Sequence, residues 1–391
     1  WKNFRRSSAE STVYQFFPRC IMQKNTIFSG KGVLYMKRNP AEKRLQLIIG
    51  IIFLFALAFC TAEKAAAWKG TMKWSYDAQN SITGSPLAAE GKILIGDSEG
   101  RLLALDQKTG SLVWTFSAGS AINGKPAVNG QAVFAGTADG KFFSLNIHSG
   151  ELLWQFSPPE INTPGGVWGS PAPGGDLVYF NSADGKVYAM DRAKGTPVWT
   201  FDTGRELRSS PTYSEGLLFV GTYEGIFHAL NAKNGKREWG GGSGAPINTA
   251  ASVSDGNVYF GSWDGILQAV RIKGVIPQWK YSTGESITTQ AVPSGNRIFF
   301  GTVNGKLVAL DRNSGGLLWE FAVPGGVHSA PAVHEGMVFF GSDGGTLFGL
   351  DAATGREVWK FQSPREIMSD PLFFESVLFF GSYDGKIYAF E

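Results

Sequence analysis

The sequence predicts an all-β fold, an eight-bladed β-propeller with four antiparallel strands in each blade. One observation is a tryptophan that recurs at steps of 40, 40, 45, 40, 40, 40 and 40 residues. Another is that each copy divides into short strands separated by glycine-containing turns. A third is that the two ends of the repeat array complete each other. Repetition at this period indicates one supersecondary unit copied in series, so residues 68–391 are expected to form a single propeller domain.

The segment before the propeller has the pattern of a leader. Residues 1–35 are interpreted as translation upstream of the true start or as a disordered segment, with Met36 as the better start. Basic residues in 36–44, an apolar stretch at 45–59 and small residues at 65–67 are typical of a secretory signal peptide over residues 36–67, cleaved after Ala67. The alternatives are a retained membrane anchor and lipidation at Cys60, although Phe59 stands where lipoprotein processing prefers a small residue.

Residues 207–242 illustrate one copy, which reads as four strands that each end at a turn. The second strand, at 217–221, is continuously apolar and is therefore expected to be covered on both faces, as in sheets that stand radially and pack against neighbouring sheets. Between the second and third strands every copy has a tip ending in glycine, such as Asp264-Gly265, which favours a hairpin turn. Calcium ligation by the tip acids is the weaker interpretation, because single carboxylates in separate turns converge poorly.

The repeating tryptophan is expected on the fourth, outer strand, where its indole packs between adjacent blades and donates a hydrogen bond. The last copy stops at Glu391, after its third strand, and residues 70–76 (GTMKWSY) supply the missing strand pattern. We therefore expect the N-terminal strand to close the last blade, which leaves no open sheet edge. The docking tryptophans are Trp74, Trp114, Trp154, Trp199, Trp239, Trp279, Trp319 and Trp359.

Charge and cysteine content narrow the classes of function. Residues 1–67 hold eleven Lys and Arg against three acids, so residues 68–391 keep 25 basic and 30 acidic side chains, a net charge of −5. An acidic body without a basic run argues against nucleic acid as a partner. Both cysteines, Cys20 and Cys60, lie in the leader, which excludes a disulfide or a thiolate metal site within the repeats.

The segment 104–114 (ALDQKTGSLVW) and its counterparts at 309–319 and 349–359 resemble the PQQ-like β-propeller repeat, whose tryptophan-docking motif is Ala-x-Asp-x-x-Thr-Gly-x-x-x-Trp. The resemblance covers residues 70–391. One copy departs from it, because Arg271 replaces the acid, the Thr-Gly pair that should follow is missing, and Gly241 replaces the aromatic residue two positions after Trp239. We expect that blade edge to be either looser or used for contact.

Two branches of this superfamily differ in function. The resemblance to quinoprotein dehydrogenases implies pyrroloquinoline quinone and calcium on the propeller axis, with a catalytic Asp and a vicinal disulfide, but no cysteine follows residue 60 here. The resemblance to BamB-like scaffolds of outer-membrane protein assembly implies an exported eight-bladed propeller that binds its partner through loops on one face, without cofactor, metal or catalytic residues. Size, blade number and export favour the second branch.

Comparison of the copies separates constant positions, expected to serve the fold, from variable ones, which are candidates for function. One variable column precedes the innermost strand and should ring the mouth of the central channel, on the face where the hairpin tips carry Tyr223, Trp263 and Tyr383. The column consists of Thr83, Asn123, Trp168, Arg208, Asn248, Thr288, His328 and Met368. From this face we select as partner-binding candidates Trp168, Arg205, Arg208, Trp263, His328 and Arg365.

Each candidate also has a structural interpretation. Trp168 lies in the enlarged loop 157–171 and either contacts a partner or plugs the channel. The three arginines are also consistent with solvated loop charges, and His328 with a hydrogen-bonded filler. The remaining histidines, His148, His228 and His334, fall at other repeat positions and form no metal-binding pattern with it.

The primary functional hypothesis is an exported, non-catalytic scaffold for protein–protein interaction, with a BamB-like role in outer-membrane protein assembly. We expect a periplasmic or extracellular monomer with a protein partner in the cell envelope and membrane association only through that partner or an uncleaved leader. The alternative is an oxidoreductase or sensor that binds pyrroloquinoline quinone with calcium. A third hypothesis is a glycan-binding propeller, suggested by aromatic residues at the channel mouth.

Overall fold

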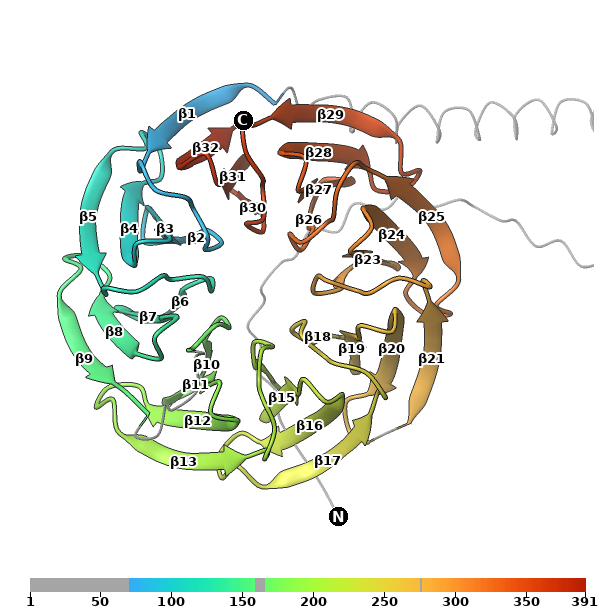
Figure 1. The fold of residues 1–391 in the computed structure, drawn as a ribbon, viewed down its shortest axis with the longest axis horizontal. Coiled ribbons are helices and arrows are strands. Elements are labelled where there is room, and N and C mark those ends of the chain that lie inside the picture. The colour runs from blue at the N-terminus through green and yellow to red at the C-terminus, as the bar shows by residue number, and fades with distance from the viewer. Residues whose placement is uncertain (1–69, 159–165, 275) are drawn as a thin grey trace, which may run out of the picture. The chain divides into compact units, whose positions relative to one another are not determined.

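The computed structural model describes residues 70–158, 166–274 and 276–391. Over these residues the chain forms eight four-stranded antiparallel sheets arranged as blades around a central axis, which confirms the predicted eight-bladed propeller (Figure 1). The predicted signal peptide, its cleavage site and Cys60 lie outside the described residues, as does the middle of the enlarged loop, 159–165.

Each blade runs from an innermost strand of three residues to an outer strand at the rim (Figure 1). Blade 1 is β2 (Leu87–Ala89), β3 (Lys92–Gly96), β4 (Arg101–Asp106) and β5 (Leu112–Ser117). Blade 2 is β6 (Ala127–Asn129), β7 (Ala132–Gly136), β8 (Phe142–Asn146) and β9 (Leu152–Phe156). Blade 3 is β10 (Ala172–Gly174), β11 (Leu177–Asn181), β12 (Lys186–Asp191) and β13 (Pro197–Asp202). Blade 4 is β14 (Thr212–Ser214), β15 (Leu217–Gly221), β16 (Ile226–Asn231) and β17 (Arg237–Gly242).

The second half of the ring repeats this order. Blade 5 is β18 (Ser252–Ser254), β19 (Asn257–Gly261), β20 (Ile266–Arg271) and β21 (Pro277–Ser282). Blade 6 is β22 (Val292–Ser294), β23 (Arg297–Gly301), β24 (Lys306–Asp311) and β25 (Leu317–Ala322). Blade 7 is β26 (Ala332–His334), β27 (Met337–Gly341), β28 (Thr346–Asp351) and β29 (Glu357–Gln362). Blade 8 is β30 (Leu372–Phe374), β31 (Val377–Gly381), β32 (Lys386–Phe390) and β1 (Met72–Asp77).

The hydrophobic core lies between blades, as the doubly apolar second strands predict. In β15, four of the five residues are buried, and Phe219 packs in one cluster with Phe227 of the same blade and with Val258 and Phe260 of blade 5. The rings of Phe227 and Phe260 stack with centroids 4.1 Å apart. Each pair of neighbouring sheets therefore shares a core, so that no blade is stable as an isolated unit.

The N-terminal strand closes the ring, as predicted. β1 pairs antiparallel with β32, with Trp74 opposite Ala389 and Tyr76 opposite Ile387. Backbone hydrogen bonds of 2.8 Å join Thr71 and Glu391 in both directions. Strands from the two ends of the propeller therefore lie side by side in one sheet, next to blade 1 (Figure 1).

The outer-strand tryptophans dock onto the next blade. Trp114 on β5 donates its indole N–H to the carbonyl of Ile147 in blade 2 at 3.0 Å, and its ring covers Gly150, where an added Cβ would lie 2.7 Å from Trp114 Cδ2. Glycine at this turn is required both by the close approach and by its φ of +74°. The departing copy keeps its contact, since Trp239 donates to Ile272 O at 3.0 Å and β17 pairs along its length with β16. The strand pairing and the docking hydrogen bond are therefore both present at that edge.

Candidate functional site

The loops that link successive blades and the hairpin tips between second and third strands lie on one face of the propeller, here called the mouth face. The backbone shows this directly, because the tip residue Tyr223 donates its N–H to Glu206 O at 2.9 Å, and Trp263 donates to Pro246 O at 2.9 Å. Tyr383 makes the corresponding bond to Glu366 O at 3.0 Å. The structure thus places the variable column and the hairpin tips on the same face, as expected.

Four side chains of the mouth face, from blades 3, 4 and 5, form what we call the aromatic arc: Trp168, Arg208, Tyr223 and Trp263. The guanidinium carbon of Arg208 lies 4.6 Å from the centroid of the Tyr223 ring, a cation–π geometry. The Tyr223 and Trp263 rings meet edge to face at 5.9 Å. Trp168 is 45% exposed and Trp263 42% exposed. Two tryptophan rings with this much exposure therefore flank the partly buried Tyr223, and exposed apolar groups gathered on one face often mark an interaction site.

The other two predicted arginines lie on the same face but outside these ring contacts. Arg365 pairs with Glu366 at 3.1 Å, much as Arg208 pairs with Glu206 at 2.8 Å. Both arginine side chains are at least half exposed, so these pairs contribute little to stability. Arg205 lines a shallow hollow of 420 Å³ between the tips of blades 3 and 4. The arginines therefore remain available to a partner.

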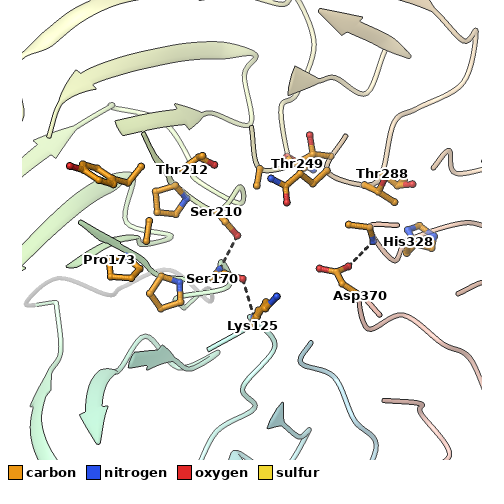
Figure 2. A pocket seen from close by; sticks show the side chains of 18 residues that line it. Lys125, Ser170, Pro173, Ser210, Thr212, Thr249, Thr288, His328 and Asp370 are labelled. Carbon is orange, nitrogen blue, oxygen red and sulfur yellow. Dashed lines mark hydrogen bonds between the residues drawn. The ribbon is translucent and has the colours of Figure 1, made fainter. Parts of the chain in front are cut away.

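His328 lies apart from the aromatic arc. With Asn248 and Thr288 it lines a cavity of 470 Å³ bounded by residues of blades 2 through 8, which we call the channel cavity (Figure 2). His328 Nε2 is 3.4 Å from Asp343 Oδ2, and Gly326 donates its N–H to the same oxygen at 3.0 Å. Of the eight column positions, three line this cavity, whereas Trp168 and Arg208 do not.

Two charged residues of the channel cavity, Lys125 and Asp370, were not among the sequence candidates. Both belong to a second column just before the innermost strands, where six of the eight copies have a proline as the next residue and two have an alanine. The column reads Ser85, Lys125, Ser170, Ser210, Ala250, Gln290, Ala330 and Asp370. A lysine and an aspartate among small or neutral residues are a signal that the comparison of copies could have found. The sequence analysis missed them because it examined one variable column only.

The residues present do not fit the quinone alternative. In the described part of the chain, no three His, Cys, Asp or Glu side chains are grouped so that they could hold a metal ion. Pyrroloquinoline quinone is a planar tricarboxylate, whereas the lining of the channel cavity offers Tyr213 as its one large aromatic ring and Lys125 and His328 as its basic groups, with Asp370 as an opposing charge. We therefore derive no chemistry through that cofactor.

His228 is a core residue rather than a site residue. It is 5% exposed, its ring meets Phe201 edge to face, and neither ring nitrogen has a hydrogen-bond partner. Burial, with a smaller contribution from the nearby Arg237, lowers the pKa of His228 to about 4. The imidazole is therefore neutral in the folded protein at neutral pH.

This burial predicts acid sensitivity. Between pH 6.5, the ordinary pKa of histidine, and about 4, the unfolded chain binds a proton at His228 that the folded protein does not. The free energy of unfolding should therefore fall as the pH is lowered through this range, by up to about 3 kcal/mol from this residue. Phe143 and Phe348 occupy the equivalent position in blades 2 and 7, so His228→Phe is the matched variant. Urea unfolding at pH 7 and pH 4.5 should show a smaller loss in His228→Phe than in the wild type; an equal loss would contradict the assignment.

The described residues include no helix with the length and apolar character needed to cross a bilayer. A family model described as outer membrane protein assembly factor BamB matches the chain in three overlapping stretches, residues 63–196, 183–294 and 279–391. No curated protein sequence matches the chain significantly.

Solved structures with the same fold include proteins of different function. BamB from Moraxella catarrhalis aligns with a TM-score of 0.72 and 18% identity, over 82% of this chain and 99% of that one. A europium-containing methanol dehydrogenase aligns with a TM-score of 0.71 and 13% identity, over 84% of this chain and 94% of that one. The computationally designed protein Ika8 aligns with a TM-score of 0.71 and 19% identity, over 82% and 99%. At these identities the likeness shows the fold alone.

Proposed function

The chain belongs to the family of outer membrane protein assembly factor BamB, and from that premise we propose that it is an exported, non-catalytic scaffold that binds a protein partner in the cell envelope through its mouth face. In this proposal the protein acts in the periplasm or outside the cell after its leader is cleaved, and its partner belongs to the outer-membrane protein assembly machinery. The observation that carries the proposal is the aromatic arc.

The chemistry of the aromatic arc suits a protein partner. Tryptophan, tyrosine and arginine are the residues that most often dominate the binding energy of protein interfaces, because each buries a large area while keeping a polar group that can be satisfied. Trp263 and Tyr223 hold each other in place, and Arg208 is fixed over Tyr223 by the ring contact and by Glu206. Side chains that are ordered before binding lose little conformational entropy when a partner docks. The arc therefore offers a rigid platform for a partner that brings apolar side chains and a carboxylate.

A triple variant tests the proposal. Trp168→Ala, Arg208→Ala and Trp263→Ala together should weaken partner capture by at least about 100-fold, since interface residues of these types commonly contribute 1–2 kcal/mol or more each. The three side chains are exposed on the mouth face and take no part in the shared cores, so the melting temperature should stay within a few degrees of the wild type. The measurement is a pull-down from envelope extract, with the captured protein identified and its affinity then determined.

The matched control removes exposed apolar side chains elsewhere. Leu152, Leu153 and Leu318 lie on outer strands at the rim and are 48%, 53% and 45% exposed. Their triple alanine variant should capture the partner as the wild type does. Undiminished capture by the arc variant, or equal loss in both variants, would count against the mouth face as the binding surface.

A further inference from the structure

The channel cavity is lined by two charged side chains that the fold does not require, Lys125 and Asp370. Its walls come from the segments at the start of the innermost strands, and its polar groups include the hydroxyls of Ser170, Ser210 and Thr288 and the amide of Gln290 (Figure 2). A volume of 470 Å³ is within the ordinary range for a small-molecule site, roughly 300–1,000 Å³. None of the four residues of the aromatic arc lines this cavity.

Residues of the second column, which contains Lys125 and Asp370, form hydrogen bonds between neighbouring blades. The N–H of Ser170 donates to Ser210 Oγ at 2.8 Å, and the N–H of Lys125 donates to Ser170 Oγ at 3.0 Å. On the other side, the N–H of Ala330 donates to Asp370 Oδ1 at 2.6 Å, and the N–H of Asp370 donates to Ser85 Oγ at 2.9 Å. A serine hydroxyl in this column is therefore sufficient to accept the hydrogen bond from the backbone N–H of the neighbouring blade. The second carboxylate oxygen of Asp370 and the ammonium group of Lys125 are not needed for this link.

The two charges face the cavity without satisfying each other. Figure 2 shows the Lys125 ammonium and the Asp370 carboxylate directed toward one another across open space. Within the described residues, Lys125 Nζ has no hydrogen bond or ion pair, whereas the Asp370 carboxylate accepts from the Ala330 N–H and interacts with the Ser85 hydroxyl of blade 1. Burial lowers the pKa of Lys125 and raises the pKa of Asp370, and each charge partly offsets the effect on the other. Both side chains are partly exposed in the cavity, so a ligand with groups of complementary charge can reach each of them.

We propose that the channel cavity binds a small zwitterion, an amino acid or a dipeptide, whose carboxylate pairs with Lys125 and whose ammonium group pairs with Asp370. A ligand with one sign of charge would satisfy one of the two residues and be repelled by the other, whereas a zwitterion satisfies both. The hydroxyl and amide groups around the cavity supply the remaining donors and acceptors. Volume limits the ligand to a few residues, and the mixed charge favours free peptide termini. This site is independent of partner binding at the mouth face.

Blocked peptides test the proposal on the wild-type protein. The probes are L-alanine, L-alanyl-L-alanine, its N-acetylated form, which lacks the ammonium group, and its C-terminal amide, which lacks the carboxylate. By isothermal titration calorimetry or saturation-transfer NMR, at least one free zwitterion should bind, and each blocked dipeptide should bind at least about tenfold more weakly than the free dipeptide. No binding of either free zwitterion, or equal binding of the blocked and free dipeptides, would overturn the proposal.

Two substitutions link each ligand charge to one residue. Asp370→Asn keeps an oxygen for the Ala330 N–H, so the blade contact is retained, and Lys125→Met keeps the apolar stem of the side chain. Asp370→Asn should bind the dipeptide at least about tenfold more weakly and no longer distinguish it from the N-acetylated form; Lys125→Met should lose the distinction from the amide in the same way. The control is Lys194→Met, whose side chain is 75% exposed on blade 3, and which should bind as the wild type does. Unchanged selectivity in both cavity variants would refute the assignment, while partner capture should be unaffected by either.

Discussion

Deletion of residues 70–76 is expected to make the protein aggregate. The deletion removes β1 almost entirely, so the backbone groups of β32 that now pair with β1 become an open sheet edge. It also removes Trp74, whose indole N–H donates to Gln107 O at 3.2 Å and which is the outer contact of the cluster between blades 8 and 1. The deletion therefore removes the last strand pairing and disrupts one interblade core at the same time.

Light scattering after size-exclusion chromatography measures the aggregation. A variant that changes only side chains of β1 is the control, because it keeps the backbone pairing of the strand. Met72, Lys73 and Ser75 point away from the core, and the ion pair of Lys73 with Glu391 is surface-exposed and contributes about 0–1 kcal/mol. A triple alanine variant at these positions keeps the backbone of β1 and should remain monomeric with a nearly unchanged melting temperature. A deletion variant that is monomeric and stable would contradict the role of β1 in closure.

The repeat makes the fold of this protein predictable to an unusual extent. Each copy is a separate sequence that encodes the same structural unit. Glycine at the position of Gly150 recurs as Gly110, Gly315 and Gly355, so the sequence alone indicates that the backbone requires it. The closure of blade 8 followed because its missing strand matched the surplus strand at residues 70–76. At the departing copy the docking contact is kept, because the Trp239 hydrogen bond needs the carbonyl of residue 272 and not the side chains that the motif has lost.

The same comparison is less informative for the site. Periodicity shows which residues share a face, and it placed the column of Arg208 with the hairpin tips of Tyr223 and Trp263, whose side chains the structure shows in contact. It cannot show that Arg208 lies over Tyr223, because that contact depends on the rotamers of the two side chains, or that Lys125 and Asp370 face one cavity, because that relation joins blades 2 and 8. A side-chain contact between blades depends on ring curvature and rotamers, which no single repeat encodes.

Replacing Trp114 by alanine should destabilise the protein by about 3–5 kcal/mol, the usual cost of removing a buried tryptophan. The side chain is 8% exposed, packs in the core shared by blades 1 and 2, and loses its hydrogen bond to Ile147 O. Gly150→Ala should also be costly, because the new Cβ would lie 2.7 Å from Trp114 Cδ2 and because φ at this position is +74°. The steric part of the destabilisation by Gly150→Ala depends on the Trp114 indole. The part caused by the positive φ, about 1–2 kcal/mol, does not.

The two changes should therefore couple. In the Trp114→Ala background the clash at Gly150 disappears, so the double variant should be more stable than the sum of the single effects predicts, by at least about 1 kcal/mol. Gly150→Ala combined with Trp319→Ala is the matched control, since Trp319 docks on Gly355 of another blade, and these two costs should add within about 0.5 kcal/mol. Urea unfolding of the single and double variants measures both cycles. If the destabilisations caused by Trp114→Ala and Gly150→Ala simply added, as those of the control pair should, then Gly150 would not be required by the Trp114 indole. The docking contact would then contribute less to interblade stability than its geometry indicates.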